Sequence, residues 1–218
     1  MTASLSFERD LIEQGYRCIV GIDEAGRGAW AGPVSAGAVV LPLERPDLLQ
    51  SLEGVNDSKQ LSARIRESLI DGIKSIALAW GIGRAEADEI DTLGIVPATC
   101  LAMRRAIDAL HLDPDYLLLD SIKWRGFPDK HIDYEAIVRG DSLSLSIAAA
   151  SVLAKVSRDA WMVEYDVQYP GYGFAIHKGY GVPQHQAALR DLGASPLHRM
   201  TYKPLQQPLL PLSFEESE

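Results

Sequence analysis

The sequence has few cysteines and no long apolar run. Cys18 and Cys100 are its two cysteines, and both stand among apolar residues. This pattern indicates small buried side chains rather than a disulfide framework or a thiolate metal site. No apolar run approaches the length that crosses a membrane, and residues 1–17 lack the apolar centre of a signal peptide. We therefore expect a cytoplasmic protein without membrane association.

Positive charge is also scarce. The chain carries 21 Lys and Arg against 30 Asp and Glu, a formal net charge of −9. This balance argues against a protein that coats nucleic acid non-specifically, because such binding depends on neutralising phosphates. A local basic groove beside an acidic metal site remains compatible with a nuclease. The chain has no Gly-Lys dipeptide and therefore no Walker loop, and the glycines at 26, 28 and 32 do not fit a dinucleotide-binding motif.

The order of predicted elements defines the fold class. Apolar stretches predict strands at 17–23, 34–42, 78–83, 115–120 and 135–141, and helical patterns occupy 62–76, 96–110, 146–165 and 185–193. Interleaved strands and helices predict an α/β fold with a central mixed β-sheet flanked by helices on both faces. The change in character after residue 165 predicts a catalytic domain over 1–165, followed by a small C-terminal helical subdomain and acidic tail over 166–218.

Acidic residues stand where three predicted strands end. They are Asp23 with Glu24, Asp120, and Asp141. A single Asp after a strand is usually a turn or cap residue, but four acids at one edge of a sheet need a cation between them. Mg²⁺ is held by a few carboxylates, and two such ions are a known apparatus for phosphodiester hydrolysis. Asp159 is a secondary candidate, because an unbroken helix would carry it about 27 Å from Asp141.

The loop after the first strand, "GIDEAGRGAWAG", contains three glycines at 26, 28 and 32. They indicate a backbone that approaches a ligand closely or adopts dihedral angles closed to other residues. A backbone that approaches a sugar edge can contact a 2′-hydroxyl, which is how proteins distinguish RNA from DNA.

Five segments together resemble the type 2 ribonuclease H family in its bacterial ribonuclease HII form. They are "GIDEAGRG..AGPV", "NDSKQLS", "DYLLLD", "GDSLSLSIAAASVLAKVSRD" and "HKGYGVPQH", in that order along residues 18–200. The resemblance implies a ribonuclease H-like fold that uses Mg²⁺ or Mn²⁺. It implies cleavage of the RNA strand of RNA/DNA hybrids and cleavage 5′ of single ribonucleotides in duplex DNA, as in ribonucleotide excision repair.

The resemblance also implies roles for individual residues. The metal-binding carboxylates would be Asp23, Glu24, Asp120 and Asp141. The loop whose backbone contacts the ribose 2′-hydroxyl would be Gly26, Arg27 and Gly28, and Tyr180 would pack against the sugar. Lys59 is a phosphate-contact candidate, as are Lys155, Lys178 and Arg199. Ala29, Trp30 and Ser121 depart from the family pattern, which usually has proline, leucine and glycine there.

We therefore predict a monomeric endoribonuclease that works by two-metal-ion hydrolysis and leaves 3′-hydroxyl and 5′-phosphate ends. Its binding partners would be RNA/DNA hybrids and ribonucleotide-containing DNA duplexes. Two alternatives remain open at this point. A junction resolvase of the same fold would cut branched DNA without contacting a 2′-hydroxyl, and a Mg²⁺-binding module would recognise hybrids without cutting them.

Overall fold

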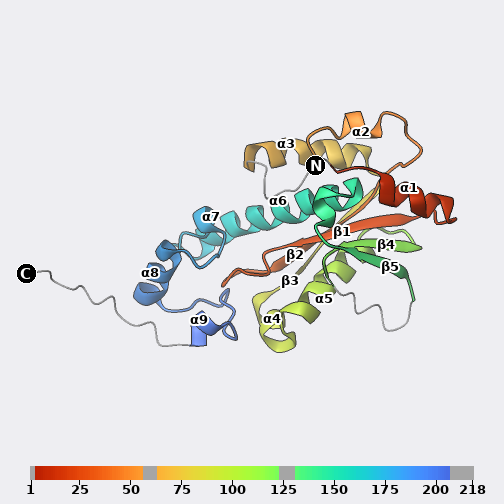
Figure 1. Ribbon diagram of the computed structural model, residues 1–218. Helices are drawn as coiled ribbons and strands as arrows, with labels where there is room; N and C mark the ends of the chain where they lie inside the picture. Colours follow the sequence, from red (N-terminus) through yellow and green to blue (C-terminus); the bar gives the residue numbers. More distant parts are fainter. Residues whose placement is uncertain (1–2, 56–62, 123–130, 207–218) are drawn as a thin grey trace, which may run out of the picture.

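The computed structural model describes residues 3–55, 63–122 and 131–206, except for the side chains at 63, 64, 66 and 67. Lys59 and the acidic tail therefore lie outside the described residues. A mixed five-stranded sheet with the order β3-β2-β1-β4-β5 forms the centre (Figure 1). Strand β1 pairs antiparallel with β2 and parallel with β4. The strands are β1 Ile19–Ala25, β2 Val34–Val40, β3 Ala79–Ala85, β4 Tyr116–Asp120 and β5 Asp133–Ile137.

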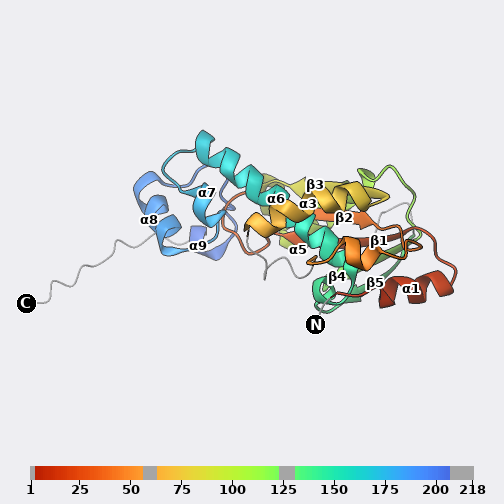
Figure 2. The same ribbon diagram turned by 90° about the horizontal axis from the view of Figure 1, so that it is seen from above.

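Helices cover both faces of this sheet. Helix α5 packs on β1, β2 and β3 from one side, whereas α6 packs on β1 and β2 from the other and is itself flanked by α3. Figure 2 shows α6 running across the sheet towards α7, α8 and α9 beyond one end. The helices are α1 Ser6–Glu13, α2 Leu48–Ser51, α3 Ala63–Ile76, α4 Ala87–Leu93, α5 Ile95–Asp108, α6 Leu145–Gln168, α7 Phe174–His177, α8 Pro183–Leu192 and α9 Lys203–Gln206. No helix among the described residues is long and apolar enough to cross a membrane.

The alternation of side chains along β1 separates the core from the acidic edge. Val20 and Ile22 belong to the apolar cluster that α5 covers. The intervening residues face α6, and a Cβ at Gly21 would lie 2.2 Å from the Ser146 backbone. The glycine therefore lets α6 lie close against the sheet, and Asp23, two residues further, emerges on the same α6 side.

The predicted α/β class and mixed sheet are confirmed, but several boundaries differ. Strand β5 ends at Ile137, so the prediction that a strand runs to Asp141 was wrong. Asp141 lies instead in a short 3₁₀ helix, η1 Gly140–Ser142. Helix α1 was not predicted. The boundary between a catalytic domain and a C-terminal subdomain after residue 165 stays a prediction, and α6 continues to Gln168.

Helix α1 anchors the start of α6 through one buried carboxylate. Glu8 is completely buried, and its Oε1 accepts hydrogen bonds from the Ser144 hydroxyl at 2.6 Å and the Ser146 N–H at 3.0 Å. A carboxylate at this position satisfies an N–H that has no partner within the helix and interacts favourably with the positive helix end.

We expect Glu8→Ala to lower the free energy of unfolding by about 1–3 kcal/mol, because it leaves buried donors without an acceptor. Chemical denaturation measures this loss. Glu13→Ala, at an exposed position of the same helix, is the control and should change stability by less than about 0.5 kcal/mol. Equal effects of the two variants would contradict the anchoring role of Glu8.

Candidate active site

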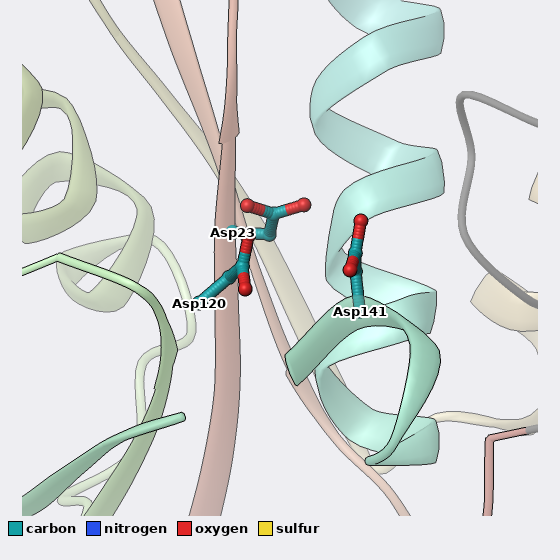
Figure 3. A group of neighbouring side chains, drawn as sticks. All are labelled: Asp23, Asp120 and Asp141. Carbon is teal, nitrogen blue, oxygen red and sulfur yellow. The ribbon is translucent and has the colours of Figure 1, made fainter. Parts of the chain in front are cut away.

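Three carboxylates converge beside the start of α6. Asp23 lies near the end of β1, and Asp120 is the last residue of β4. Because Ile22 pairs with Leu119 in the parallel ladder, the two aspartates follow at the same level of neighbouring strands. Asp141 approaches from η1. One carboxylate oxygen from each aspartate lies within 4.8 Å of the other two (Figure 3).

Hydrogen bonds to Asp120 hold this arrangement in place. Its Oδ1 accepts from the Gly140 N–H at 2.8 Å and from the Ser121 hydroxyl at 3.2 Å. Gly140 immediately precedes Asp141, so the first bond fixes the distance between the two acidic segments. Ser121 adopts a left-handed backbone conformation with φ 46°. Its hydroxyl also accepts from the Arg139 N–H at 3.3 Å, so this departure from the family pattern adds hydrogen bonds to the turn.

Burial and like charge both act on Asp23. Its pKa lies well above the usual value for an aspartate, first because of burial and then because of the Glu24 and Asp120 charges. The Ser151 hydroxyl and the Glu24 N–H lower the pKa in part. The Oδ2 atom of Asp23 is buried and has no hydrogen-bond partner of normal geometry among the described residues. A buried, oxygen-only group with an open acceptor fits a hard divalent cation such as Mg²⁺ or Mn²⁺.

Glu24 lies next to the three aspartates but is not one of the group defined by the 4.8 Å distance. Its Oε1 accepts a hydrogen bond from Arg27 Nη1 at 3.1 Å. Its charge still reaches the site, because it raises the Asp23 pKa. The structure therefore brings three of the four predicted carboxylates into one group and places the fourth beside it.

Asp159 lies far along α6 from this group. Its position relative to Leu145, the first residue of the helix, corresponds to roughly 21 Å at about 1.5 Å per residue. Its Oδ1 pairs with Lys155 Nζ at 2.5 Å. Lys155 Nζ in turn lies 5.9 Å from the centre of the Tyr180 ring. Asp159 therefore belongs to the surroundings of Tyr180, and a direct metal role for it remains a prediction only.

The glycine loop, residues 26–33 between β1 and β2, combines two different uses of glycine. Gly26 has φ +92°, and a Cβ there would lie 1.9 Å from Arg158 Nε. Gly28 is exposed, its φ is outside the left-handed region, and a Cβ there would meet nothing within 4 Å. Gly26 is thus required by the fold itself, whereas Gly28 leaves open space at the surface.

The tyrosine loop, residues 177–182, lies directly against the glycine loop. The Trp30 N–H donates to the Gly179 carbonyl at 2.8 Å. The Trp30 ring packs on Gly181, where a Cβ would lie 2.1 Å from ring atoms. Tyr180 is 36% exposed and presents its ring at the surface. Trp30, a departure from the family pattern, therefore forms part of the contact between the two loops.

Two buried arginines support these loops, and sequence reasoning did not identify their role. Arg158 and Arg199 are completely buried. The prediction that Arg199 contacts phosphate was wrong, because its guanidinium bonds backbone carbonyls in the interior. The usable signal for Arg158 was a basic residue within a largely apolar helical stretch, "SIAAASVLAKVSRDAWM".

The fold and the carboxylate group together define a metal-dependent nuclease of the ribonuclease H-like class. The family model described as "Ribonuclease HII" matches residues 20–205. The chain therefore belongs to the ribonuclease HII family, whose members are endoribonucleases that act on RNA/DNA hybrids and use divalent metal ions.

Individual relatives agree with this assignment. The chain is 53% identical over 203 residues to ribonuclease HII of Syntrophotalea carbinolica, with 93% of each chain covered. It is 50% identical over 210 residues to ribonuclease HII of Myxococcus xanthus, covering 96% of this chain and 69% of that protein.

Solved structures share the fold. Ribonuclease H2 of Pyrococcus horikoshii OT3 matches with a TM-score of 0.72 at 24% identity, covering 87% of this chain and 96% of that one. The Mn²⁺ complex of Bst-RNase HIII matches with a TM-score of 0.67 at 18% identity, covering 88% and 69%.

We expect Asp23→Asn to stabilise the protein in metal-free buffer. A raised pKa in the folded state means that stability falls as the pH rises towards and through that pKa, and asparagine removes this loss. A gain of about 1 kcal/mol corresponds to roughly 2–4 °C in Tm for a chain of this size. Differential scanning fluorimetry at pH 8 in chelator measures it.

Added Mn²⁺ should raise the wild-type Tm, since a ligand at about 100 times its Kd contributes about 2.7 kcal/mol, and this effect should be lost in Asp23→Asn. Asp108→Asn, an exposed aspartate of α5, is the control and should behave as wild type. A Mn²⁺ shift that survives in Asp23→Asn would place the metal elsewhere.

The separation of Asp141 and Asp159 predicts unequal losses of activity. Asp141→Asn should lower kcat/KM more than about a hundredfold, or about 2.7 kcal/mol. Asp159→Asn should lower it less than about tenfold, as expected for one ion pair near the site. Steady-state kinetics on one RNA/DNA hybrid compares the two, with melting curves as the check on folding. Equal losses would show that Asp159 acts at the metal site.

Proposed function

We propose that this chain cuts the RNA strand of RNA/DNA hybrids and also cuts 5′ of single ribonucleotides in duplex DNA, leaving 3′-hydroxyl and 5′-phosphate ends. The observation that carries the proposal is the group formed by Asp23, Asp120 and Asp141, whose oxygens lie within 4.8 Å of one another. A nuclease that relies on metal ions needs such a group and needs no nucleophilic Ser or Cys.

We assign the divalent ions, Mg²⁺ or Mn²⁺, to these three aspartates together with Glu24. Two bound ions would supply Lewis-acid activation of water and stabilisation of the leaving 3′-oxygen. The protein's own contribution is placement. The Gly140 N–H bond to Asp120 at 2.8 Å and the buried position of Asp23 support a site whose ligands are held in place before the metal binds.

The ribose is contacted at the glycine loop and Tyr180. Gly28 is exposed and a Cβ there would have open space, which supports close approach of a sugar to the backbone. The Tyr180 ring stands over the Arg158 guanidinium at 5.5 Å from its centre and remains partly exposed. Arg27 bonds Glu24, which places a cation of the glycine loop beside the carboxylates. Lys59 is assigned to phosphate contact on the sequence motif alone.

We further assign this protein to the cytoplasm, to a monomeric state and to the first incision of ribonucleotide repair. A solved structure of the PCNA:RNase HII complex from Archaeoglobus fulgidus matches this chain at 26% identity and a TM-score of 0.69, covering 87% of this chain and 97% of that one. The complex is a property of that protein.

The decisive substrate is a DNA duplex with one ribonucleotide, incubated with Mg²⁺ or Mn²⁺ while cut position and end chemistry are mapped. We expect one cut on the 5′ side of the ribonucleotide. An all-DNA duplex and an Asp120→Asn protein are the controls and should give no product. Cleavage of branched all-DNA junctions would favour a resolvase, and binding without any cut would favour a recognition module.

Gly28→Ala tests the close approach of the sugar. Because the added methyl group meets no protein atom within 4 Å, Tm should change by less than about 2 °C. KM for the single-ribonucleotide duplex should rise about tenfold or more, since a contact worth about 1.4 kcal/mol corresponds to tenfold. The control is Gly72→Ala, because Gly72 also has open space and its φ is not left-handed. Gly54 is unsuitable as a control position because its φ is +86°. An unchanged KM in Gly28→Ala, with Gly72→Ala as control, would contradict the proposed contact.

Tyr180→Phe keeps the ring and removes the hydroxyl. We expect weaker cutting at a single ribonucleotide and a smaller loss on long hybrids, where many 2′-hydroxyls offer alternative registers. One lost hydrogen bond to a charged group is worth about 1.5–3 kcal/mol, or roughly tenfold to hundredfold. The measurement is the ratio of kcat/KM on the two substrates. The same ratio in wild type and variant would mean that Tyr180 is a packing residue only.

A further inference from the structure

Arg158 connects three segments that the proposed function requires to act together. From α6 its Nε donates to the Pro33 carbonyl at 2.8 Å and its Nη2 to the Ala31 carbonyl at 3.1 Å. Its Nη1 donates to the Lys178 carbonyl at 2.9 Å. The first two carbonyls belong to the glycine loop, and the third belongs to the tyrosine loop. One guanidinium therefore holds both loops and also lies beneath the Tyr180 ring.

Arg199 repeats this arrangement on the other part of the glycine loop. Its Nε and Nη2 donate to the Gly32 carbonyl at 3.0 and 2.8 Å, and its Nη1 donates to the Arg27 carbonyl at 2.9 Å. The Tyr202 hydroxyl donates to the same Arg27 carbonyl at 2.6 Å. The Arg199 N–H also bonds the Trp30 carbonyl at 2.8 Å.

In the glycine loop, several backbone carbonyls are hydrogen-bonded whereas two backbone N–H groups are not. The Arg27, Ala31, Gly32 and Pro33 carbonyls are all occupied by donors from the protein. In contrast, the N–H groups of Arg27 and Gly28 make no hydrogen bond within the described part of the chain. Gly28 is also exposed. The carbonyls are thus turned towards the interior, and the two adjacent donors remain available to an acceptor outside.

Neither guanidinium forms a salt bridge with a carboxylate that the structure describes. Burial lowers the pKa of Arg158 to about 10 and also lowers that of Arg199. A buried cation without an ion-pair partner is costly unless its donors are satisfied. Here carbonyl oxygens satisfy them, and a fork of fixed geometry is required to reach several carbonyls at once. Lysine keeps the charge but cannot reproduce that fork.

We propose that Arg158 and Arg199 are positioning residues for ribose recognition, because they hold the glycine loop with its carbonyls inward and join it to the tyrosine loop. This inference rests on the proposed ribose contact of Gly26, Arg27 and Gly28. Neither arginine touches the substrate. Their effect is to fix the outward N–H groups and the Tyr180 ring in one rigid arrangement, so that a ribonucleotide is recognised at both places.

The test compares binding of two fluorescent duplexes that are identical except for one ribonucleotide. Anisotropy titrations in chelator, where no cleavage occurs, give Kd for the ribonucleotide duplex and for the all-DNA duplex. The variants are Arg158→Lys, Arg199→Lys and Tyr202→Phe. The control is Arg105→Lys, which alters a partly exposed arginine paired with Glu89 on α4.

Discrimination is measured by the Kd for the all-DNA duplex divided by the Kd for the ribonucleotide duplex. We expect this ratio to fall about tenfold in Arg158→Lys and Arg199→Lys. Tyr202→Phe removes the hydroxyl that donates to the Arg27 carbonyl and accepts from Arg199 Nη1, and should give about a threefold fall. The Kd for all-DNA should stay within twofold of wild type, and Arg105→Lys should change neither value. Hydrogen exchange should accelerate at the Trp30 amide, which bonds Gly179 across the two loops.

The outcomes separate the two proposals. Suppose that the wild type binds the ribonucleotide duplex more tightly than the all-DNA duplex. If every variant that folds then keeps the wild-type ratio of Kd values, the positioning role of the arginines is wrong. If a variant raises both Kd values by the same factor, the arginine has only a structural role and the inference is again wrong. If wild type itself shows no discrimination, the proposed ribose contact fails first. Should a lysine variant not fold, Tyr202→Phe decides the question.

Discussion

The carboxylates of Asp23 and Asp120 are forced together by the parallel pairing of β1 with β4, and much of the site depends on this constraint. The register puts both at one level, and the Gly140 N–H bond to Asp120 adds Asp141 to them. Burial of Asp23, and after it the like charges of Glu24 and Asp120, raise its pKa, so the ionised group opposes folding. Cations that neutralise them are therefore coupled to stability as well as to hydrolysis, so the active site is a place where the apo fold gives up stability for function.

The neighbouring loops are held by a second constraint, which comes from positively charged side chains. Arg158 and Arg199 place two buried cations beneath the glycine loop, and backbone carbonyls satisfy their donors. The group of three aspartates thus lies next to a loop held by buried positive groups, within a chain whose formal net charge is −9. The local arrangement of charged groups, rather than the net charge of the chain, makes this surface compatible with nucleic acid.

Much of this could be predicted from the sequence, because the relevant signals are local. Apolar strands that end in acids predicted the sheet and the acidic edge, and the family resemblance was confirmed. Asp141 shows the limit of this reasoning. Its predicted strand ends at Ile137, and a left-handed turn at Arg139 followed by a 3₁₀ helix delivers the side chain instead. The buried contacts of Arg158 and Arg199 could not be predicted, since each depends on carbonyls distant in sequence. Glu8 was missed because its hydrogen-bond donors, at Ser144 and Ser146, are also distant in sequence.

If the group of three aspartates is the metal site of this ribonuclease HII family member, a divalent ion must bind to these residues directly. Anomalous diffraction from crystals soaked in Mn²⁺, at a concentration that supports cleavage, locates the bound ion. We expect a Mn²⁺ peak within about 2.0–2.3 Å of oxygens from Asp23, Asp120 and Asp141, distances typical of a small hard divalent ion. A well-occupied Mn²⁺ peak that contacts none of these three residues would contradict this assignment.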